Sequence, residues 1–360
     1  MSDFANLLGQ LQKSAKKVND AGDKQNSSTG SLNRKHSAGF FNDSSVSKKQ
    51  KSNHYKQDRG TPCPVKVGKV SRLPSDAKDL CVKLSFLCIG AQKAGSSWLH
   101  EMLRRHPKLC LPEQKELHFW DWHRRRGLSW YSEQFRFADK ANKSKLPDIL
   151  CGEITPCYIT LPETDICEIK ALFPDVKLIF LVRDLVDRAW SALLMELRNA
   201  VRGVQLGKFD IEDRVDQRQI DKLDRESDPA RQTDDYFMER LTHSTHTERS
   251  DYAKGLIRWL KYFSKDQLII LDYEQISRQP KELLEKICEH IGIESASLFN
   301  VLSAKDMSTK VNAATGTTSN QAMRPSLRRK MENHLRPMAR EFNLLLDELA
   351  YDIRISEYGG

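Results

Sequence analysis

A turn rich in glycine, serine and lysine follows the first strongly apolar run of the chain. Residues 84–90 read LSFLCIG, and residues 91–97 continue as AQKAGSS. From Trp98 onward, apolar residues recur at helical spacing. A buried strand that turns into a helix leaves backbone N–H groups unpaired at the helix N-terminus, where the helix dipole is positive. With the ammonium group of Lys93 beside it, this turn predicts a site for a phosphate or a similar anion.

A second candidate anion site follows a second apolar run. Residues 176–182 read VKLIFLV and predict a buried strand, and Arg183 comes directly after it. Ser191 lies eight residues further on, about two turns into a predicted helix. An arginine fork at the carboxyl end of a strand and a hydroxyl on the next helix can bind one phosphate from two sides. The alternative is that Arg183 pairs with Asp184 or Asp187 and that Ser191 lies on a packed helix face.

The first turn differs from the nucleotide P-loop, GxxxxGK[ST]. In the P-loop the lysine follows the second glycine, whereas here Lys93 precedes Gly95 by two positions. This difference argues against an ordinary ATPase or kinase, although a P-loop nucleotide kinase or NTPase stays open as an alternative.

The two sites need a sheet that brings strand ends together. Apolar runs predict strands, and 3.6-residue periodicity predicts helices. The predicted strands are 84–90, 149–153, 176–182 and 267–272, and the predicted helices are 96–105, 162–172, 185–200, 252–263, 280–291 and 325–347. Strands that alternate with helices indicate an α/β fold, with a parallel sheet covered by helices on both faces.

The charge of the chain is concentrated at its N-terminus. Lys and Arg total 58 and Asp and Glu total 49, which gives a net charge of +9. Residues 1–78 hold 15 basic and 6 acidic residues, so the remainder is neutral overall. A neutral folded part does not favour a broad polyanion-binding face. We therefore expect no nucleic-acid partner, although a non-catalytic nucleic-acid-binding module acting through the basic tail is a second alternative.

The chain is predicted to consist of a tail and one large domain. Residues 1–78 are rich in Ser, Asn, Lys, Gln and Gly, which favours a disordered basic tail. Apolar residues at helical spacing predict a short amphipathic helix over 3–19. No run approaches the roughly 20 apolar residues of a membrane helix, and no signal peptide is evident. We therefore expect a soluble, cytoplasmic protein, with a nuclear location left open by the basic tail.

The cysteines and histidines predict no metal site. The eight cysteines include no CxxC pair and no spacing typical of metal ligands. His243 and His246 have no nearby cysteine or carboxylate at ligand spacing. We expect free thiols in a reducing compartment and no metal requirement.

The two anion sites, in this order and about 90 residues apart, resemble those of the sulfotransferases, which use 3′-phosphoadenosine 5′-phosphosulfate (PAPS) as donor. Residues 93–98 (KAGSSW) are similar to the 5′-phosphosulfate loop, and Arg183 with Ser191 to the 3′-phosphate motif. Residues 115–120 (KELHFW) and 152–158 (GEITPCY) resemble segments of carbohydrate-type, heparan-type and bacterial members. The resemblance covers roughly residues 80–345. It implies a P-loop-type sulfotransferase fold, with the domain at 79–352.

The resemblance also implies donor contacts. Backbone N–H groups after Lys93 would hold the 5′-phosphate, and Arg183 and Ser191 would bind the 3′-phosphate. Trp98 would stack on adenine, although its helical spacing fits a core position equally well. Tyr252 would be a second purine contact. The implied cofactor-binding residues are Lys93, Ala94, Gly95, Ser96, Ser97, Trp98, Arg183, Ser191, Tyr252 and, from a loose match, Lys310.

Glu116 is the predicted base of the transfer. An acceptor hydroxyl must lose its proton as the new S–O bond forms, and a positioned carboxylate can take that proton. His118 is the competing base or a residue that orients Glu116. Lys93 would neutralise the charge that develops on the bridging oxygen. The acceptor is predicted to be a small molecule or a glycan, with a carbohydrate-like hydroxyl favoured over an amine.

Overall fold

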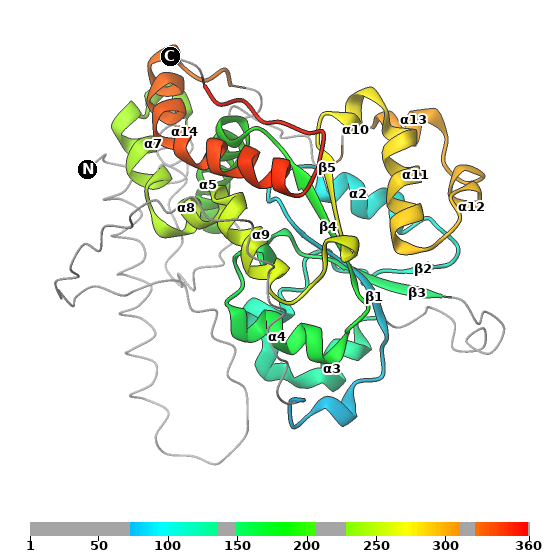
Figure 1. Ribbon diagram of the computed structural model, residues 1–360. Helices are drawn as coiled ribbons and strands as arrows, with labels where there is room; N and C mark the ends of the chain where they lie inside the picture. The colour runs from blue at the N-terminus through cyan, green and yellow to red at the C-terminus, as the bar shows by residue number, and fades with distance from the viewer. Residues whose placement is uncertain (1–72, 136–148, 206–227, 310, 312–320, 359–360) are drawn as a thin grey trace, which may run out of the picture.

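The computed structural model describes residues 73–135, 149–205, 228–309, 311 and 321–358. Within these ranges the chain forms one five-stranded parallel sheet with the order β2-β3-β1-β4-β5. Figure 1 shows the sheet in the middle of the molecule. The strands are β1 (Leu84–Gly90), β2 (Leu109–Cys110), β3 (Leu150–Ile154), β4 (Lys177–Val182) and β5 (Leu268–Asp272).

The central strands are buried on both faces. Every residue of β4 after Lys177 is buried, and the same holds for β1 apart from Ser85. Continuous apolar runs rich in branched side chains are typical of parallel strands covered by helices on both sides. Because all five strands are parallel, their carboxyl ends meet at one edge of the sheet.

Gly152 allows the close contact between β1 and β3. It lies opposite Phe86 in the register of the two strands. A Cβ atom at this position would overlap the aromatic ring of Phe86. The missing side chain therefore creates the space that the fully buried Phe86 ring fills.

Helices cover the sheet from both sides. In Figure 1, α10, α11, α12 and α13 lie on one side, whereas α3, α4 and α9 lie on the other. The larger helices are α2 (Ser96–Leu103), α3 (Gly127–Glu133), α4 (Glu163–Leu172), α5 (Leu185–Gln205), α7 (Asp234–Leu241), α8 (Ser244–Ser250), α9 (Tyr252–Leu260), α11 (Pro280–Ile291) and α14 (Pro325–Glu348). Three short helices complete this set: α10 (Gln275–Arg278), α12 (Ala296–Phe299) and α13 (Ala304–Ser308).

The predicted α/β fold is confirmed, and each strand and helix predicted between residues 84 and 347 is present with small shifts at its ends. The sequence did not predict β2, which has two residues, or the short helices α3, α7, α8, α10, α12 and α13. Elements this short show too few repeats for a periodic pattern to be recognised.

The N-terminal boundary of the folded part includes Asp76. Its carboxylate accepts hydrogen bonds from the Arg124 guanidinium at 2.7 and 2.9 Å and from the backbone N–H of Leu128 at 3.1 Å. Arg124 also pairs with Glu168, so this arginine supports the fold and is not free to bind an acceptor. The predicted tail and its helix over 3–19 lie outside the described residues except for positions 73–78.

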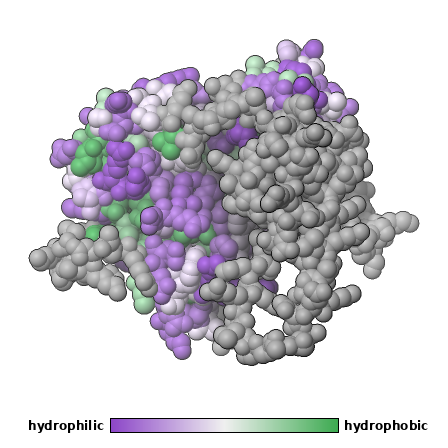
Figure 2. Space-filling view, turned by 180° about the vertical axis from the view of Figure 1, so that it is seen from behind, coloured by the Kyte–Doolittle hydropathy of each residue, from purple (hydrophilic) through white to green (hydrophobic). Residues whose placement is uncertain are grey.

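The visible surface is mostly hydrophilic. On the face shown in Figure 2, purple residues dominate the coloured area, and the green patches are small. Among the described residues, no helix is long and apolar enough to cross a membrane.

Candidate active site

The predicted anion turn joins β1 to α2. Lys93 and Gly95 both have positive φ angles, 69° and 88°, and Gly95 is the N-cap residue of α2. A Cβ atom on Gly95 would clash with Ile276, so only glycine fits both the backbone angle and the space. No side chain of the described residues caps this helix end. The first N–H groups of an α-helix have no partner within the helix, and this arrangement suits an anion.

Lys93 lies among other cations. Its ammonium nitrogen is 3.7 Å from the sulfur of Met195 on α5. Burial, and then the nearby charges of Arg198 and Arg183, lower the pKa of Lys93. An anion bound here would relieve this repulsion and would raise the pKa again.

Arg183 connects the two predicted anion sites. Its guanidinium donates a hydrogen bond of 2.7 Å to the backbone carbonyl of Lys93 and lies 4.7 Å from the centre of the Tyr273 ring. Its own carbonyl accepts a hydrogen bond of 3.1 Å from the Tyr252 hydroxyl. The turn after β1 and the start of α5, 90 residues apart in the chain, thus meet at the carboxyl ends of adjacent strands.

The two predicted serine contacts lie on the helices that leave these sites. Ser97 is in the first turn of α2, and Ser191 is in the second turn of α5. Both side chains are partly exposed. Lys310 lies outside the described residues.

Trp98 and Tyr252 occupy interior positions. Trp98 is 4% exposed, and its indole N–H donates a hydrogen bond of 2.9 Å to the carbonyl of Met307. Tyr252 is fully buried, with edge-to-face contacts to Phe180 and Phe342. Both rings are closely packed in this structure, and their contacts with a purine stay a prediction.

The predicted base belongs to a cluster of four ionisable side chains. The Glu116 carboxylate accepts hydrogen bonds from the Lys115 ammonium at 2.5 Å and from the His118 Nε2 at 3.3 Å. The Nδ1 atom of His118 lies 2.7 Å from an oxygen of Asp121. Glu116 and His118 have positive φ angles of 64° and 51°. Such angles are strained in residues other than glycine and concentrate at functional sites.

The cluster holds Glu116 ionised and His118 protonated. Burial alone would raise the pKa of Glu116, but the His118 hydrogen bond and the Lys115 charge outweigh it and lower the pKa to about 2. Burial would likewise lower the pKa of His118, but the hydrogen bonds to Asp121 and Glu116 raise it to about 9. His118 is thus an imidazolium between two carboxylates, which favours its role in orienting Glu116 over its role as the base.

Glu153 anchors the loop that carries this cluster. Its buried carboxylate accepts hydrogen bonds from the hydroxyls of Tyr158 at 2.6 Å, Tyr131 at 2.7 Å and Thr155 at 2.8 Å. The Tyr158 hydroxyl in turn accepts a hydrogen bond of 2.9 Å from the backbone N–H of Phe119. The segment directly after His118 is therefore tied to the end of β3.

One group of side chains in the described residues could offer ligands to a metal ion. Donor atoms of Glu116, His118 and Cys157 lie within 4.8 Å of one another. The Lys115 ammonium already contacts Glu116, and burial raises the pKa of Cys157 to about 11, which keeps the thiol protonated. The ion pairs of Glu116 and His118 and the protonated thiol of Cys157 make these three side chains poor metal ligands.

Sequence reasoning missed two members of this site. Asp121 follows His118 by three residues, and this spacing could have suggested the pair. Lys115 belongs to the segment 115–120 (KELHFW) but was assigned no role. Glu153 and Tyr158 belong to the segment 152–158 (GEITPCY). Their contacts with residues 119–131 join distant parts of the chain, so no local sequence pattern predicts them.

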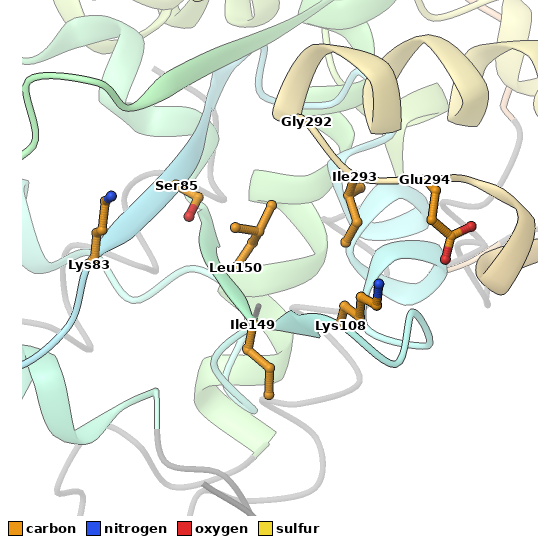
Figure 3. A pocket seen from close by; sticks show the side chains of 8 residues that line it. All are labelled: Lys83, Ser85, Lys108, Ile149, Leu150, Gly292, Ile293 and Glu294. Carbon is orange, nitrogen blue, oxygen red and sulfur yellow. The ribbon is translucent and has the colours of Figure 1, made fainter. Parts of the chain in front are cut away.

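One hollow among the described residues lies at the other end of the sheet. It measures about 510 Å³ and includes residues at the start of β1 and β3, as Figure 3 shows. Lys93 and Arg183 lie beyond the carboxyl ends of β1 and β4, so this hollow is separate from the candidate site. The lining residues are Lys83, Ser85, Lys108, Ile149, Leu150, Gly292, Ile293 and Glu294.

Comparisons with known proteins identify the family of the chain. The family model of the sulfotransferase domain matches residues 84–354. The chain is 32% identical over 119 residues to the membrane-associated sulfotransferase kil1 of Dictyostelium discoideum, a match that covers 33% of this chain and 24% of that protein. It is 26% identical over 272 residues to the heparan sulfate glucosamine 3-O-sulfotransferase 3B1 of Mus musculus, covering 71% of this chain and 60% of that protein. The chain therefore spans less than two thirds of either relative.

Among solved structures, the sulfotransferase from Alicyclobacillus acidocaldarius is similar with a TM-score of 0.47 and 19% identity. That similarity covers 76% of this chain and 98% of the other.

Proposed function

Because the chain belongs to the sulfotransferase domain family, we propose that it moves a sulfuryl group from PAPS to an acceptor hydroxyl, or less readily to an amine. The observation that carries this proposal is the hydrogen bond from Arg183 to the Lys93 carbonyl. It holds the two proposed phosphate contacts, Arg183 and the turn of Lys93, side by side. A nucleotide with a phosphate at each end of its ribose matches such a pair better than ATP, whose phosphates form a single chain.

The donor would bind across the carboxyl ends of β1 and β4. Backbone N–H groups of residues 95–97 would hold the 5′-phosphate at the start of α2, whereas the Ala94 N–H donates to the carbonyl of Ala91 at 3.2 Å. Arg183 and Ser191 would bind the 3′-phosphate, and the Lys93 ammonium would lie next to the bridging oxygen. Burial and the nearby Arg198 and Arg183 lower the pKa of Lys93, and a bound phosphate would offset both effects.

The transfer needs one base and one electrostatic catalyst. As the acceptor oxygen bonds to sulfur, its proton passes to the Glu116 carboxylate. The bond between sulfur and the bridging oxygen breaks, and its electron pair stays on the 5′-phosphate, where Lys93 stabilises the charge. The imidazolium of His118 keeps Glu116 oriented through this step. No step uses a metal ion or a covalent intermediate.

A carbohydrate acceptor is favoured by an exposed tryptophan beside the base. Trp122 is 61% exposed, and one face of its ring stacks on His118 at 3.8 Å between centroids with an interplanar angle of 9°. Its exposed face can pack against the apolar face of a sugar ring. The glucosamine acceptor in the name of the mouse relative is consistent with this choice.

The donor is tested by thermal shift with 3′-phosphoadenosine 5′-phosphate (PAP), the product nucleotide. At a hundredfold excess over its Kd, a ligand specific for the folded state adds about 2.7 kcal/mol, which raises the Tm by about 5 °C. AMP and Mg-ATP at the same concentration should give much smaller shifts. A larger shift with Mg-ATP than with PAP would refute PAPS dependence and would favour a P-loop kinase or NTPase.

Variants test the catalytic roles. Lys93→Ala should reduce turnover of PAPS with a saccharide acceptor by about a hundredfold or more, because it removes the charge beside the leaving group. Glu116→Gln should reduce turnover similarly and leave PAP binding unchanged. Circular dichroism checks that both variants fold. Near-normal turnover by Glu116→Gln would exclude it as the base, and His118 would become the next candidate.

A further inference from the structure

The segment after α14 turns back along that helix toward the start of α5, as the red trace in Figure 1 shows. It is anchored midway by Asn343 of α14. The Asn343 side chain donates a hydrogen bond of 2.9 Å to the carbonyl of Ile355 and accepts one of 3.0 Å from its N–H. Both residues are buried. Residues 351–358 are thus a fixed part of the fold.

The segment ends against the first turn of α5. Tyr358 is 7% exposed, and its hydroxyl donates a hydrogen bond of 2.9 Å to one oxygen of Asp184. The same hydroxyl accepts a hydrogen bond of 3.2 Å from the N–H of Val186. The other oxygen of Asp184 accepts one of 3.0 Å from the N–H of Asp187. Asp184 and Tyr358 together satisfy donors that a helix N-terminus otherwise leaves unpaired.

Asp184 directly follows Arg183, whose backbone and side chain are both fixed. The Tyr252 hydroxyl holds the Arg183 carbonyl, and the Lys93 carbonyl holds the guanidinium. The Tyr358 hydroxyl in turn holds the side chain of Asp184, the next residue along the chain. A shift at Asp184 would move the backbone of Arg183 and would misalign its guanidinium with a bound phosphate, because charge-assisted hydrogen bonds depend strongly on geometry.

We propose that Tyr358 is a positioning residue for the 3′-phosphate contact of Arg183. It acts through Asp184 and the first turn of α5. This inference rests on the proposed use of PAPS. Tyr358 lies beyond residue 354, where the match to the family model ends.

The test is calorimetric titration of the full chain and its Tyr358→Phe variant with PAP and with AMP, which lacks the 3′-phosphate. Phenylalanine keeps the ring in its pocket and removes only the hydroxyl. We expect the Kd for PAP to rise about fivefold, at the low end of the coupling between linked sites. The Kd for AMP should change by less than twofold.

Tyr351→Phe is the matched control, because it removes a tyrosine hydroxyl from the same segment. The Tyr351 hydroxyl donates a hydrogen bond of 2.7 Å to the carbonyl of Leu268, at the amino end of β5 and away from Arg183. This variant should lower the Tm but leave PAP affinity unchanged. If Tyr358 acts through Asp184, adding Asp184→Asn to Tyr358→Phe should weaken PAP binding by less than the product of the two single effects.

Each outcome has a definite meaning. If Tyr358→Phe lowers the Tm like Tyr351→Phe and keeps the wild-type Kd for PAP, Tyr358 only stabilises the fold and the inference is overturned. An equal loss of affinity for PAP and AMP would also overturn it, because the effect would not be specific to the 3′-phosphate. Absence of PAP binding by the wild-type chain would overturn the proposed function and this inference with it.

Discussion

Replacement of Asp121 by asparagine tests whether His118 is an imidazolium between two carboxylates. Asparagine has nearly the same shape, and its side-chain oxygen can still accept the hydrogen bond from Nδ1. The change therefore removes one negative charge, 2.7 Å from the ring, and leaves the packing intact.

The size of the effect follows from the pKa of His118, which is raised from 6.5 to about 9. One pKa unit corresponds to 1.36 kcal/mol, so the folded protein favours the imidazolium by about 3 kcal/mol. Burial opposes this preference, and the hydrogen bond to Asp121 contributes most to it, ahead of Glu116. Without the charge of Asp121, the pKa of His118 should fall back toward its ordinary value of 6.5.

The sign of the stability change depends on pH. A pKa raised by folding adds stability that is fully present below the unfolded pKa of 6.5 and is lost as the pH rises through about 9. The His118 side chain is only 13% exposed, so solvent screens the pair little. Asp121→Asn should therefore cost about 2 kcal/mol at pH 6 and much less at pH 10.

The assay is an NMR titration of the histidine ring protons, with the His118 signal identified by its loss in His118→Gln. His290, which contacts the carbonyl of Leu178 on β4, serves as an internal reference that should not change. Melting curves at pH 6 and pH 10 check the stability effect. A wild-type His118 that titrates near 6.5, or one unaffected by Asp121→Asn, would refute the bridging imidazolium.

Two further predictions concern the end of β3. Glu153→Gln should lower the free energy of unfolding by about 1–3 kcal/mol. The new amide N–H₂ group would face the hydroxyl of Tyr131 or Tyr158, and that hydroxyl would lose its acceptor. An unchanged Tm would show that the buried carboxyl group is neutral. Gly152→Ala should lower stability by about 1–3 kcal/mol, because the added methyl overlaps the Phe86 ring. In chemical denaturation, Phe86→Leu should partly rescue Gly152→Ala, and additive losses would argue against the overlap.

The fold could be predicted from the sequence because its main elements carry strong local patterns. The runs that became β1, β4 and β5 are short, apolar and followed by turn or helix signals. The missed strand β2 consists of Leu109 and Cys110 alone. It exists because the chain passes beside β3, a tertiary cause that no periodic pattern records.

Residues of the site could be predicted only where a charged side chain comes soon after the end of a predicted strand. Arg183 directly follows a buried run, Lys93 lies in the turn after another, and a parallel sheet brings such positions together. The roles of Trp98 and Tyr252 could not be predicted in this way, because helical spacing does not distinguish a ring packed in the core from a ring that stacks on a ligand. Tyr358 was missed because its partner Asp184 lies 174 residues earlier.

The fixed position of Arg183 has a consequence for the entropy of binding. A free arginine loses up to about 2 kcal/mol of rotamer entropy when it is immobilised. Here the Lys93 carbonyl and the Tyr273 ring restrict the guanidinium before any anion arrives. Much of this side-chain entropy is therefore lost during folding and not during binding. More of the free energy of each new contact between Arg183 and an anion then contributes to affinity.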